Sequence, residues 1–278
     1  MLVSGISTAL IMEDDADWDI NIKAQLPNIA RGVQYITQAN PNPTRPNHSP
    51  YGDSWEFLTI GHCGINNHEY PVTQSPSQTT IDTTIHQRYW VTKNDPTVPP
   101  PHRRDGSRKP NLSPPVLQGD QTRLVFTPYK FTCTQAYAIS LRGAARVLQD
   151  QASGPKPQSI DLALSAMCKY NQFRAAAAVY PPLIGQHRPA GDGSKDSDRK
   201  EGVSHGAREK AFTQNVVYPT RTNFEELLGG EEGVVRSQYG GEEGMLDEIA
   251  VGKLEWFGES LPWGRGVVVD AEQFVHTA

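Results

Sequence analysis

The sequence has little of three things that would assign a protein class at once. Only three cysteines occur in 278 residues, and their spacing matches no metal-binding motif. No run of about 20 apolar residues is present, so the sequence predicts no transmembrane segment. Basic residues number 26 against 31 acidic ones, which leaves a net charge of −5 and no overall basic surface for nucleic acid. The start, MLVSGISTALIM, lacks the basic region and cleavage site of a signal peptide.

Glycine and proline are plentiful instead, with 24 and 22 residues, while apolar residues make up 37% of the chain. This composition is typical of a globular protein with long loops. A length of 278 residues suits one large domain or two small ones. The polar, Pro-rich stretch 71–115 is predicted to be an insertion with one strand near 87–92. The Gly-rich, charged residues 199–278 are predicted to be a flexible or peripheral extension.

Regular structure is predicted between these parts. Helical spacing of apolar residues predicts a helix over 22–36, which Pro27 interrupts. Two further helices are expected over 140–149 and 159–169, each with a serine at its N-cap. Short apolar runs predict strands over 7–12, 55–64, 123–126, 133–139 and 173–180. Strands that alternate with helices favour an α/β sheet, in which we expect 7–12 to be a buried strand.

The segment STALIMEDDADWD, residues 7–19, ends an apolar run on five carboxylates within seven residues. Like charges this close repel one another, and a buried carboxylate needs a partner. Ligands of open α/β sheets gather beyond the carboxyl ends of strands. Carboxylate oxygens there suit Mg²⁺ or Mn²⁺, which could hold a diphosphate. There are two alternatives: the segment is a solvated acidic turn, or one of its aspartates, Asp17 or Asp19, caps the next helix.

Five blocks of the sequence carry a resemblance, and they occur in the order TALIMEDDADWD, WEFLTIGHCG, CTQAYAISLRGAARVL, SIDLAL and VYPPLIGQHRPAGDGSKDSD. Together they resemble glycosyltransferase family 25, the lipopolysaccharide and procollagen galactosyltransferase-like family, in its fungal branch. The resemblance covers about residues 2–198. It implies a type A glycosyltransferase fold, a Rossmann-like α/β domain, over 1–198. It also implies transfer of a hexose, commonly galactose, from a UDP-sugar to a glycan or protein acceptor with inversion.

The resemblance implies a metal site at the acidic turn. Asp15 is expected to bind Mn²⁺ or Mg²⁺ directly, with Asp17 as a second ligand. Glu13 and Asp14 would serve the metal shell or the ribose of the nucleotide-sugar. A divalent ion there would stabilise the negative charge of the departing UDP. His187 is a further candidate ligand, because type A enzymes often use a late histidine, although a lone loop histidine is more often unimportant.

Inversion needs a base for the acceptor hydroxyl, and Asp161 in the block SIDLAL is the candidate. Its alternative role is to favour the dipole in the first turn of a helix. Arg188 and Lys195 are candidates for the diphosphate, or are merely exposed loop charges. His62, in the turn GHCG, is a candidate for lining the sugar pocket, or belongs to a tight turn that needs its glycines.

The sequence departs from the family at its start. Members have a first strand of the nucleotide-binding half well before the acidic block, whereas only twelve residues precede Glu13 here. The fold is therefore expected to be N-terminally incomplete, with an unpaired sheet edge and weak binding of UDP. The missing part is expected to include any N-terminal signal anchor.

The family resemblance also implies the secretory pathway, in the Golgi or endoplasmic reticulum lumen. Because that compartment is oxidising, a Cys63–Cys133 disulfide is expected, with Cys168 free. Two other functions remain open. One is a catalytically inactive binding or partner subunit. The other, a metal-dependent phosphohydrolase, lacks a recognisable array of His and Asp ligands.

Overall fold

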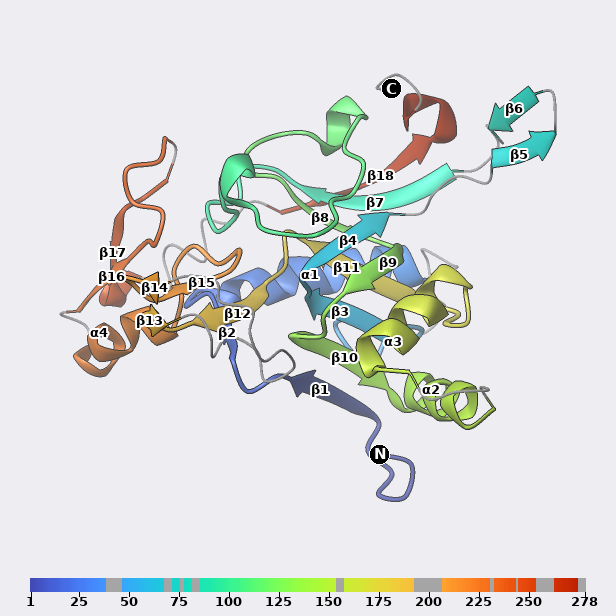
Figure 1. Cartoon of the computed structure of the whole chain (residues 1–278), viewed down its shortest axis with the longest axis horizontal. Coiled ribbons are helices and arrows are strands. Elements are labelled where there is room, and N and C mark those ends of the chain that lie inside the picture. Colours follow the sequence, from blue (N-terminus) through green and yellow to red (C-terminus); the bar gives the residue numbers. More distant parts are fainter. Residues whose placement is uncertain are drawn as a thin grey trace.

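The computed structural model describes residues 1–38, 47–67, 72–75, 78–81, 86–153, 158–192, 207–230, 233–243, 245–253 and 263–274. Its centre is a seven-stranded sheet with the order β1-β10-β3-β11-β8-β7-β18 (Figure 1). These strands are Thr8–Met12 (β1), Phe57–Gly61 (β3), His86–Thr92 (β7), Arg123–Phe126 (β8), Ala136–Ser140 (β10), Ala176–Tyr180 (β11) and Arg265–Asp270 (β18). The helices are Ile22–Thr37 (α1), Leu141–Ser153 (α2), Ile160–Lys169 (α3) and Phe224–Leu228 (α4). The chain is mixed α/β, as predicted.

Smaller sheets surround the central one. Three strands form the sheet that carries the acidic segment: Ala16–Trp18 (β2), Ile184–Arg188 (β12) and Phe212–Thr213 (β15). Four two-stranded pairs complete the described sheets: Gly64–Asn67 with Pro128–Thr132 (β4, β9), Val72–Ser75 with Gln78–Ile81 (β5, β6), Gly191–Asp192 with Ala207–Arg208 (β13, β14), and Val234–Arg236 with Glu248–Ala250 (β16, β17). Among the described residues, no helix is long and apolar enough to cross a membrane.

Alternation along the central strands creates two cores, one on each face of the sheet. Side chains of successive strand residues point to opposite faces. Val125 of β8 therefore packs with Ile29 and Val33 of α1, whereas its neighbours in β8 pack on the other face with Leu164 of α3. Helix α1 covers one face, and α3, with α2 beside it, covers the other (Figure 1).

The structure confirms the helices that the apolar periodicity predicted, with small differences at their ends. Ser140 caps α2 as predicted, because its Oγ accepts a hydrogen bond from the amide of Gly143 at 3.2 Å. Ser159 stands at the N-cap of α3 but makes no side-chain capping bond. Pro27 lies inside α1 and does not interrupt it. A proline so near the first turn removes few helical hydrogen bonds, which explains the continuity.

Strand β1 corrects the expectation of a buried strand. It lies at the edge of the central sheet and pairs only with β10 there, so Leu10 is 56% exposed. An apolar run of five residues cannot by itself separate a central strand from an edge strand. The sheet also differs from a parallel Rossmann sheet. Strands β3 and β11 are parallel, and every other neighbouring pair in the sheet is antiparallel.

The expected insertion and the expected flexible tail both contribute to the core. Strand β7, from the Pro-rich stretch 71–115, lies inside the central sheet between β8 and β18. Strand β18 itself comes from the far C-terminal part of the chain and pairs with β7 over six residues. Val217 and Tyr218 are fully buried in a small separate core. The described part of 199–278 is therefore packed structure, and its Gly-rich composition concealed this.

Candidate functional site

The acidic turn lies between the edge strand β1 and the short strand β2. The Glu13 amide donates to the Gln135 carbonyl at 3.0 Å, which continues the β1–β10 ladder by one residue. The side chain of Glu13 accepts a hydrogen bond from the Thr134 hydroxyl at 2.9 Å. Asp14 is exposed, and its backbone carbonyl accepts from the guanidinium of Arg221 at 2.5 Å. Residues from two distant segments therefore hold this turn in place.

Asp15 has one satisfied and one unsatisfied carboxylate oxygen. Antiparallel pairing of β2 with β12 brings Gln186 beside it, and the Gln186 amide donates to Asp15 Oδ2 at 2.8 Å. The backbone carbonyl of Asp15 accepts from the His187 amide at 2.8 Å, so the position is fixed. Asp15 Oδ1 is buried and has no hydrogen-bond partner in the protein. A buried acceptor without a donor is costly, so this oxygen is a position at which a further hydrogen-bond donor or a cation would be favourable.

Asp17 is fully buried, and its oxygens have partners within the protein. Its Oδ2 accepts from the Thr213 hydroxyl at 2.6 Å, and its Oδ1 from the Trp18 amide at 2.9 Å. His187 Nδ1 lies 3.2 Å from the same Thr213 hydroxyl and 3.8 Å from Asp17 Oδ2. Burial lowers the pKa of His187, and the nearby carboxylate of Asp17 opposes that shift. The pair therefore ties β2 to β12 and β15.

Asp19 supports the start of helix α1, one of the two alternatives left open for the acidic turn. Its Oδ1 accepts from the Asn21 amide at 2.9 Å, and its Oδ2 from the Tyr218 amide at 3.0 Å. Asn21, rather than Asp19, is the N-cap residue. Burial raises the pKa of Asp19 to about 6, against the lowering effect of these amide donors.

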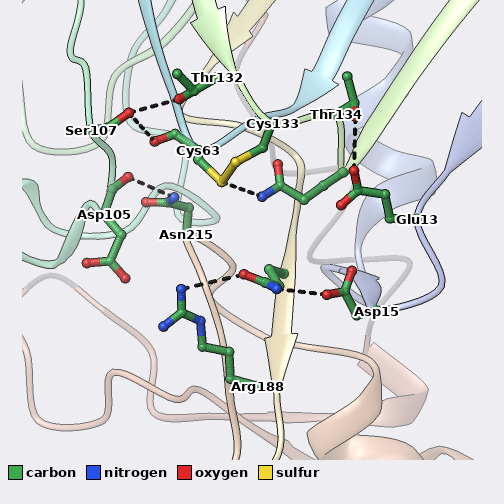
Figure 2. Close-up of a disulfide and its surroundings, with 12 residues drawn as sticks. Glu13, Asp15, Cys63, Asp105, Ser107, Thr132, Cys133, Thr134, Arg188 and Asn215 are labelled. Atoms are coloured by element: carbon green, nitrogen blue, oxygen red, sulfur yellow. Dashed lines mark hydrogen bonds between the residues drawn. A yellow bond between two sulfur atoms is a disulfide. The ribbon is translucent and has the colours of Figure 1, made fainter. Parts of the chain in front are cut away.

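The predicted Cys63–Cys133 disulfide is confirmed, and it borders the acidic turn (Figure 2). The two Cα atoms are 5.3 Å apart, within the range that a disulfide allows. Cys168 is free and buried, as expected. Cys133 has a positive φ of 61°, so the chain turns sharply there before it enters β10. The amide of Gln135 then reaches back and donates to Cys63 Sγ at 2.9 Å.

Gln135 and Asn215 were not predicted as site residues, yet they share the feature that marks Asp15. Gln135 Oε1 and Asn215 Oδ1 are buried acceptors with no hydrogen-bond partner in the protein. Figure 2 shows that Asp15 and Asn215 both lie in the surroundings of the disulfide. Gln135 donates a hydrogen bond to one of the disulfide sulfurs. Asn215 also has a positive φ of 60°, a conformation that asparagine adopts more readily than most residues. Three unsatisfied oxygens thus lie in one polar region.

Arg188 lies beside this region, close to Gln186. Its Nη2 donates to Gln186 Oε1 at 3.5 Å, and the same glutamine bonds Asp15 from its amide nitrogen. The guanidinium is partly buried and lies 5.9 Å from the centre of the Phe212 ring. The structure therefore brings Glu13, Asp15 and Arg188 into the surroundings of the disulfide (Figure 2).

The other predicted site residues lie apart or outside the described ranges. Asp161 is in the first turn of α3, with its Oδ1 buried and unpartnered, and no described hydrogen bond or ion pair joins it to the acidic turn. Lys195 lies outside the described residues. His62 is buried, and its Nε2 donates to the Val179 carbonyl at 2.9 Å, so it supports the strands rather than lining an open surface.

His62 gives a testable pH dependence. Burial lowers its pKa from 6.5 to about 4, so the folded protein keeps it neutral. Between these values the unfolded chain binds the extra proton and the folded chain does not, so stability falls as the pH drops from 6.5 to 4. The loss amounts to about 3 kcal/mol. His62→Gln cannot titrate, so wild-type protein should lose about that much more than the variant over this range in urea unfolding. Parallel pH profiles of the two proteins would contradict the assignment.

The described residues supply only part of the ligand set that a metal ion would need. They contain no group of three or more His, Cys, Asp or Glu side chains placed to hold a metal. The unsatisfied oxygen of Asp15, with the exposed Glu13 nearby, offers hard oxygen ligands that suit Mg²⁺ or Mn²⁺. Asp17 and His187 are engaged with Thr213 instead.

Comparison with known proteins adds no assignment. No protein-family model, no curated protein and no solved structure matches the chain.

Proposed function

We propose that the chain binds a UDP-sugar beside the acidic turn and transfers the hexose, galactose by resemblance, to a glycan or glycoprotein acceptor. The observation that carries the proposal is the set of three buried oxygens without donors, on Asp15, Gln135 and Asn215. Sugar hydroxyls are donors that match the oxygens of Gln135 and Asn215, and the Asp15 oxygen is left for a metal ion. Arg188 supplies the positive charge that a diphosphate requires. The proposal includes a type A glycosyltransferase relationship for the central α/β sheet.

Each residue has a role in this proposal. Asp15 and Glu13 would hold Mn²⁺ or Mg²⁺, and the ion would stabilise charge on the departing nucleoside diphosphate. Gln186 fixes the Asp15 carboxylate through its amide, so that the unsatisfied oxygen keeps its direction. Inverting transfer needs a base that takes the proton of the acceptor hydroxyl. Asp161 is the base that the resemblance implies, but it lies in the first turn of α3, apart from the acidic turn, so its role depends on an acceptor that reaches both places.

The disulfide supports a secretory location for this activity. Disulfides persist in oxidising compartments and are rare in the cytosol. The Cys63–Cys133 bond lies next to the proposed site, where Gln135 contacts it. We therefore place the protein in the Golgi or endoplasmic reticulum lumen as part of the proposal.

The proposal is tested by calorimetric titration with UDP, with and without Mn²⁺. Mn²⁺ should strengthen UDP binding to the wild-type chain, and Asp15→Asn should weaken binding in Mn²⁺ by at least about tenfold. The substitution removes a charge and no core contact, so thermal unfolding should change little. Asp120→Asn makes the same chemical change at an exposed position and should bind like wild type. UDP binding by Asp15→Asn that equals wild type in Mn²⁺ would remove Asp15 from the site.

A second candidate function is a catalytically inactive partner subunit. The engagement of Asp17 and His187, two of the predicted metal ligands, with Thr213 favours it. UDP-galactose and Mn²⁺ incubated with the chain separate the two functions. Release of UDP, alone or with an acceptor glycan, identifies an enzyme, whereas Asp15-dependent binding without release identifies a binding subunit.

A further inference from the structure

The outer side of strand β1 has open backbone groups. Along the β1–β10 ladder, the Ser7 carbonyl accepts from the Leu141 amide and the Glu13 amide donates to the Gln135 carbonyl. Antiparallel ladders alternate, so every second residue directs its N–H and C=O toward the neighbouring strand. The residues between them, Thr8, Leu10 and Met12, therefore direct theirs away from the sheet. No hydrogen bond is described for these outward amides and carbonyls.

This edge is also apolar on both faces. Leu10 is 56% exposed and Ile11 36% exposed, on opposite sides of the strand. Leu10 stands opposite Ala138 in the register and borders a cavity of about 720 Å³ under the sheet. Much of the cavity lining is apolar and includes Trp55 and Leu58. An exposed apolar edge of this kind is a template for another strand.

The two edges of the sheet differ in their protection. Strand β18, at the opposite edge, begins with Arg265 and ends with Asp270, and charges discourage pairing between edges. The sequence of β1, TALIM, contains no charge, proline or glycine. An unprotected edge on one side only indicates a specific occupant there.

We propose that β1 pairs with β1 of a second copy of this chain, antiparallel, across a two-fold axis at Leu10. In this register Leu10 pairs with its own copy, and Thr8 pairs with Met12 of the partner subunit. Each outward amide and carbonyl then gains a partner, and the two sheets become continuous. An isologous contact of this kind closes after two copies. The proposal is independent of the proposed function.

The charges of the acidic turn decide the orientation. Parallel pairing would place Glu13, Asp14 and Asp15 beside the same three residues of the partner subunit, and like charges directly opposite one another destabilise a sheet. Antiparallel pairing puts the two acidic turns at opposite ends of the shared strands. Ala9 then lies opposite Ile11 of the partner subunit, so small and large side chains alternate across the axis.

Association is tested first by light scattering of the full chain. We expect a mass of twice 30.7 kDa, and Leu10→Lys should weaken the dimer at least about tenfold because two ammonium groups would face each other. Val268→Lys on β18 is the matched control, since Val268 is 57% exposed at the other edge. An equimolar mixture of Leu10→Lys and Leu10→Glu should restore the dimer. A monomer at every concentration, or a dimer indifferent to Leu10→Lys, would overturn the proposal.

Oxidative cross-linking tests the register. Directly opposed residues in a hydrogen-bonded antiparallel pair have Cα atoms about 5.5 Å apart, which a disulfide can bridge. Leu10→Cys should therefore cross-link two copies on mild oxidation. Thr8→Cys should not, because its two copies would lie about 13 Å apart along the strands. Cross-linking of Thr8→Cys but not of Leu10→Cys would reject the antiparallel register.

Discussion

Asp95→Ala should lower the free energy of unfolding by about 3–5 kcal/mol. Asp95 forms a buried ion pair with Arg123, with 2.7 Å between Asp95 Oδ2 and Arg123 Nε. Arg123 also donates to the carbonyls of Pro181 and Thr97, so it joins the loop after β7, strand β8 and the end of β11. Removal of the carboxylate would leave the guanidinium buried without its counter-charge. The loss is measured by urea unfolding at neutral pH.

The matched control is an ion pair on the surface. Arg236 lies 3.2 Å from Glu248, and the two side chains are 64% and 57% exposed. Exposed pairs contribute about 0–1 kcal/mol, so Glu248→Ala should change stability by no more than that. Equal losses for Asp95→Ala and Glu248→Ala would show that the interior pair is hydrated and that the packing described for Arg123 is wrong.

Removal of the Cys63–Cys133 disulfide has the second large expected effect. The bond closes a loop with a sequence separation of 70, and a loop of that size constrains the unfolded chain by about 4 kcal/mol. The double variant Cys63→Ser with Cys133→Ser should therefore lose about that much stability. Reduction of the wild-type protein should produce the same loss, whereas the reductant should leave the double variant unchanged.

The disulfide variant also tests the site. Gln135 donates to Cys63 Sγ, so the bond helps to position the unsatisfied Gln135 oxygen. If the proposed site is correct, the double variant should bind UDP more weakly in Mn²⁺ at temperatures where it is still folded. Unchanged UDP binding would indicate that Gln135 is positioned by its strand alone.

The fold was predictable where a pattern is local. The apolar positions of 22–36 and the serine before 141 specified α1 and the cap of α2, because both signals lie within a few residues. Pairing partners are not local. Nothing in the five residues of TALIM distinguishes an edge from an interior strand, and nothing in RGVVVD indicates that it pairs with residues 86–91. The direction and order of the strands depend on pairing between segments far apart in the chain, and the local pattern of a single sequence contains no information about that pairing.

Of the candidate site, only the charged residues of the acidic turn were predictable, because they form a local pattern in the sequence. Five carboxylates within seven residues are a pattern that can be recognised in the sequence alone. Gln135 and Asn215 form no such pattern, because amides are common and their meaning depends on the absence of a partner after folding. Asn215 also lies in a region whose composition predicted a flexible tail. Its positive φ, rather than any motif, marks it as a fixed position.

The contact between Asp17 of β2 and Thr213 has a consequence for folding during synthesis, because the two residues are made at very different times. Asp17 finds its Thr213 partner 196 residues later in the chain, and at about 5–20 residues per second the ribosome needs about 10–40 s to provide it. Until then the carboxylates stay in water, where their mutual repulsion keeps this segment extended. They flank the apolar strand β1 and act during that interval as gatekeepers against aggregation of the nascent chain. Asp17 and Asp19 therefore protect the chain before it folds and are enclosed only after Thr213 and Tyr218 have been made, whereas Glu13 and Asp14 stay exposed in the folded protein.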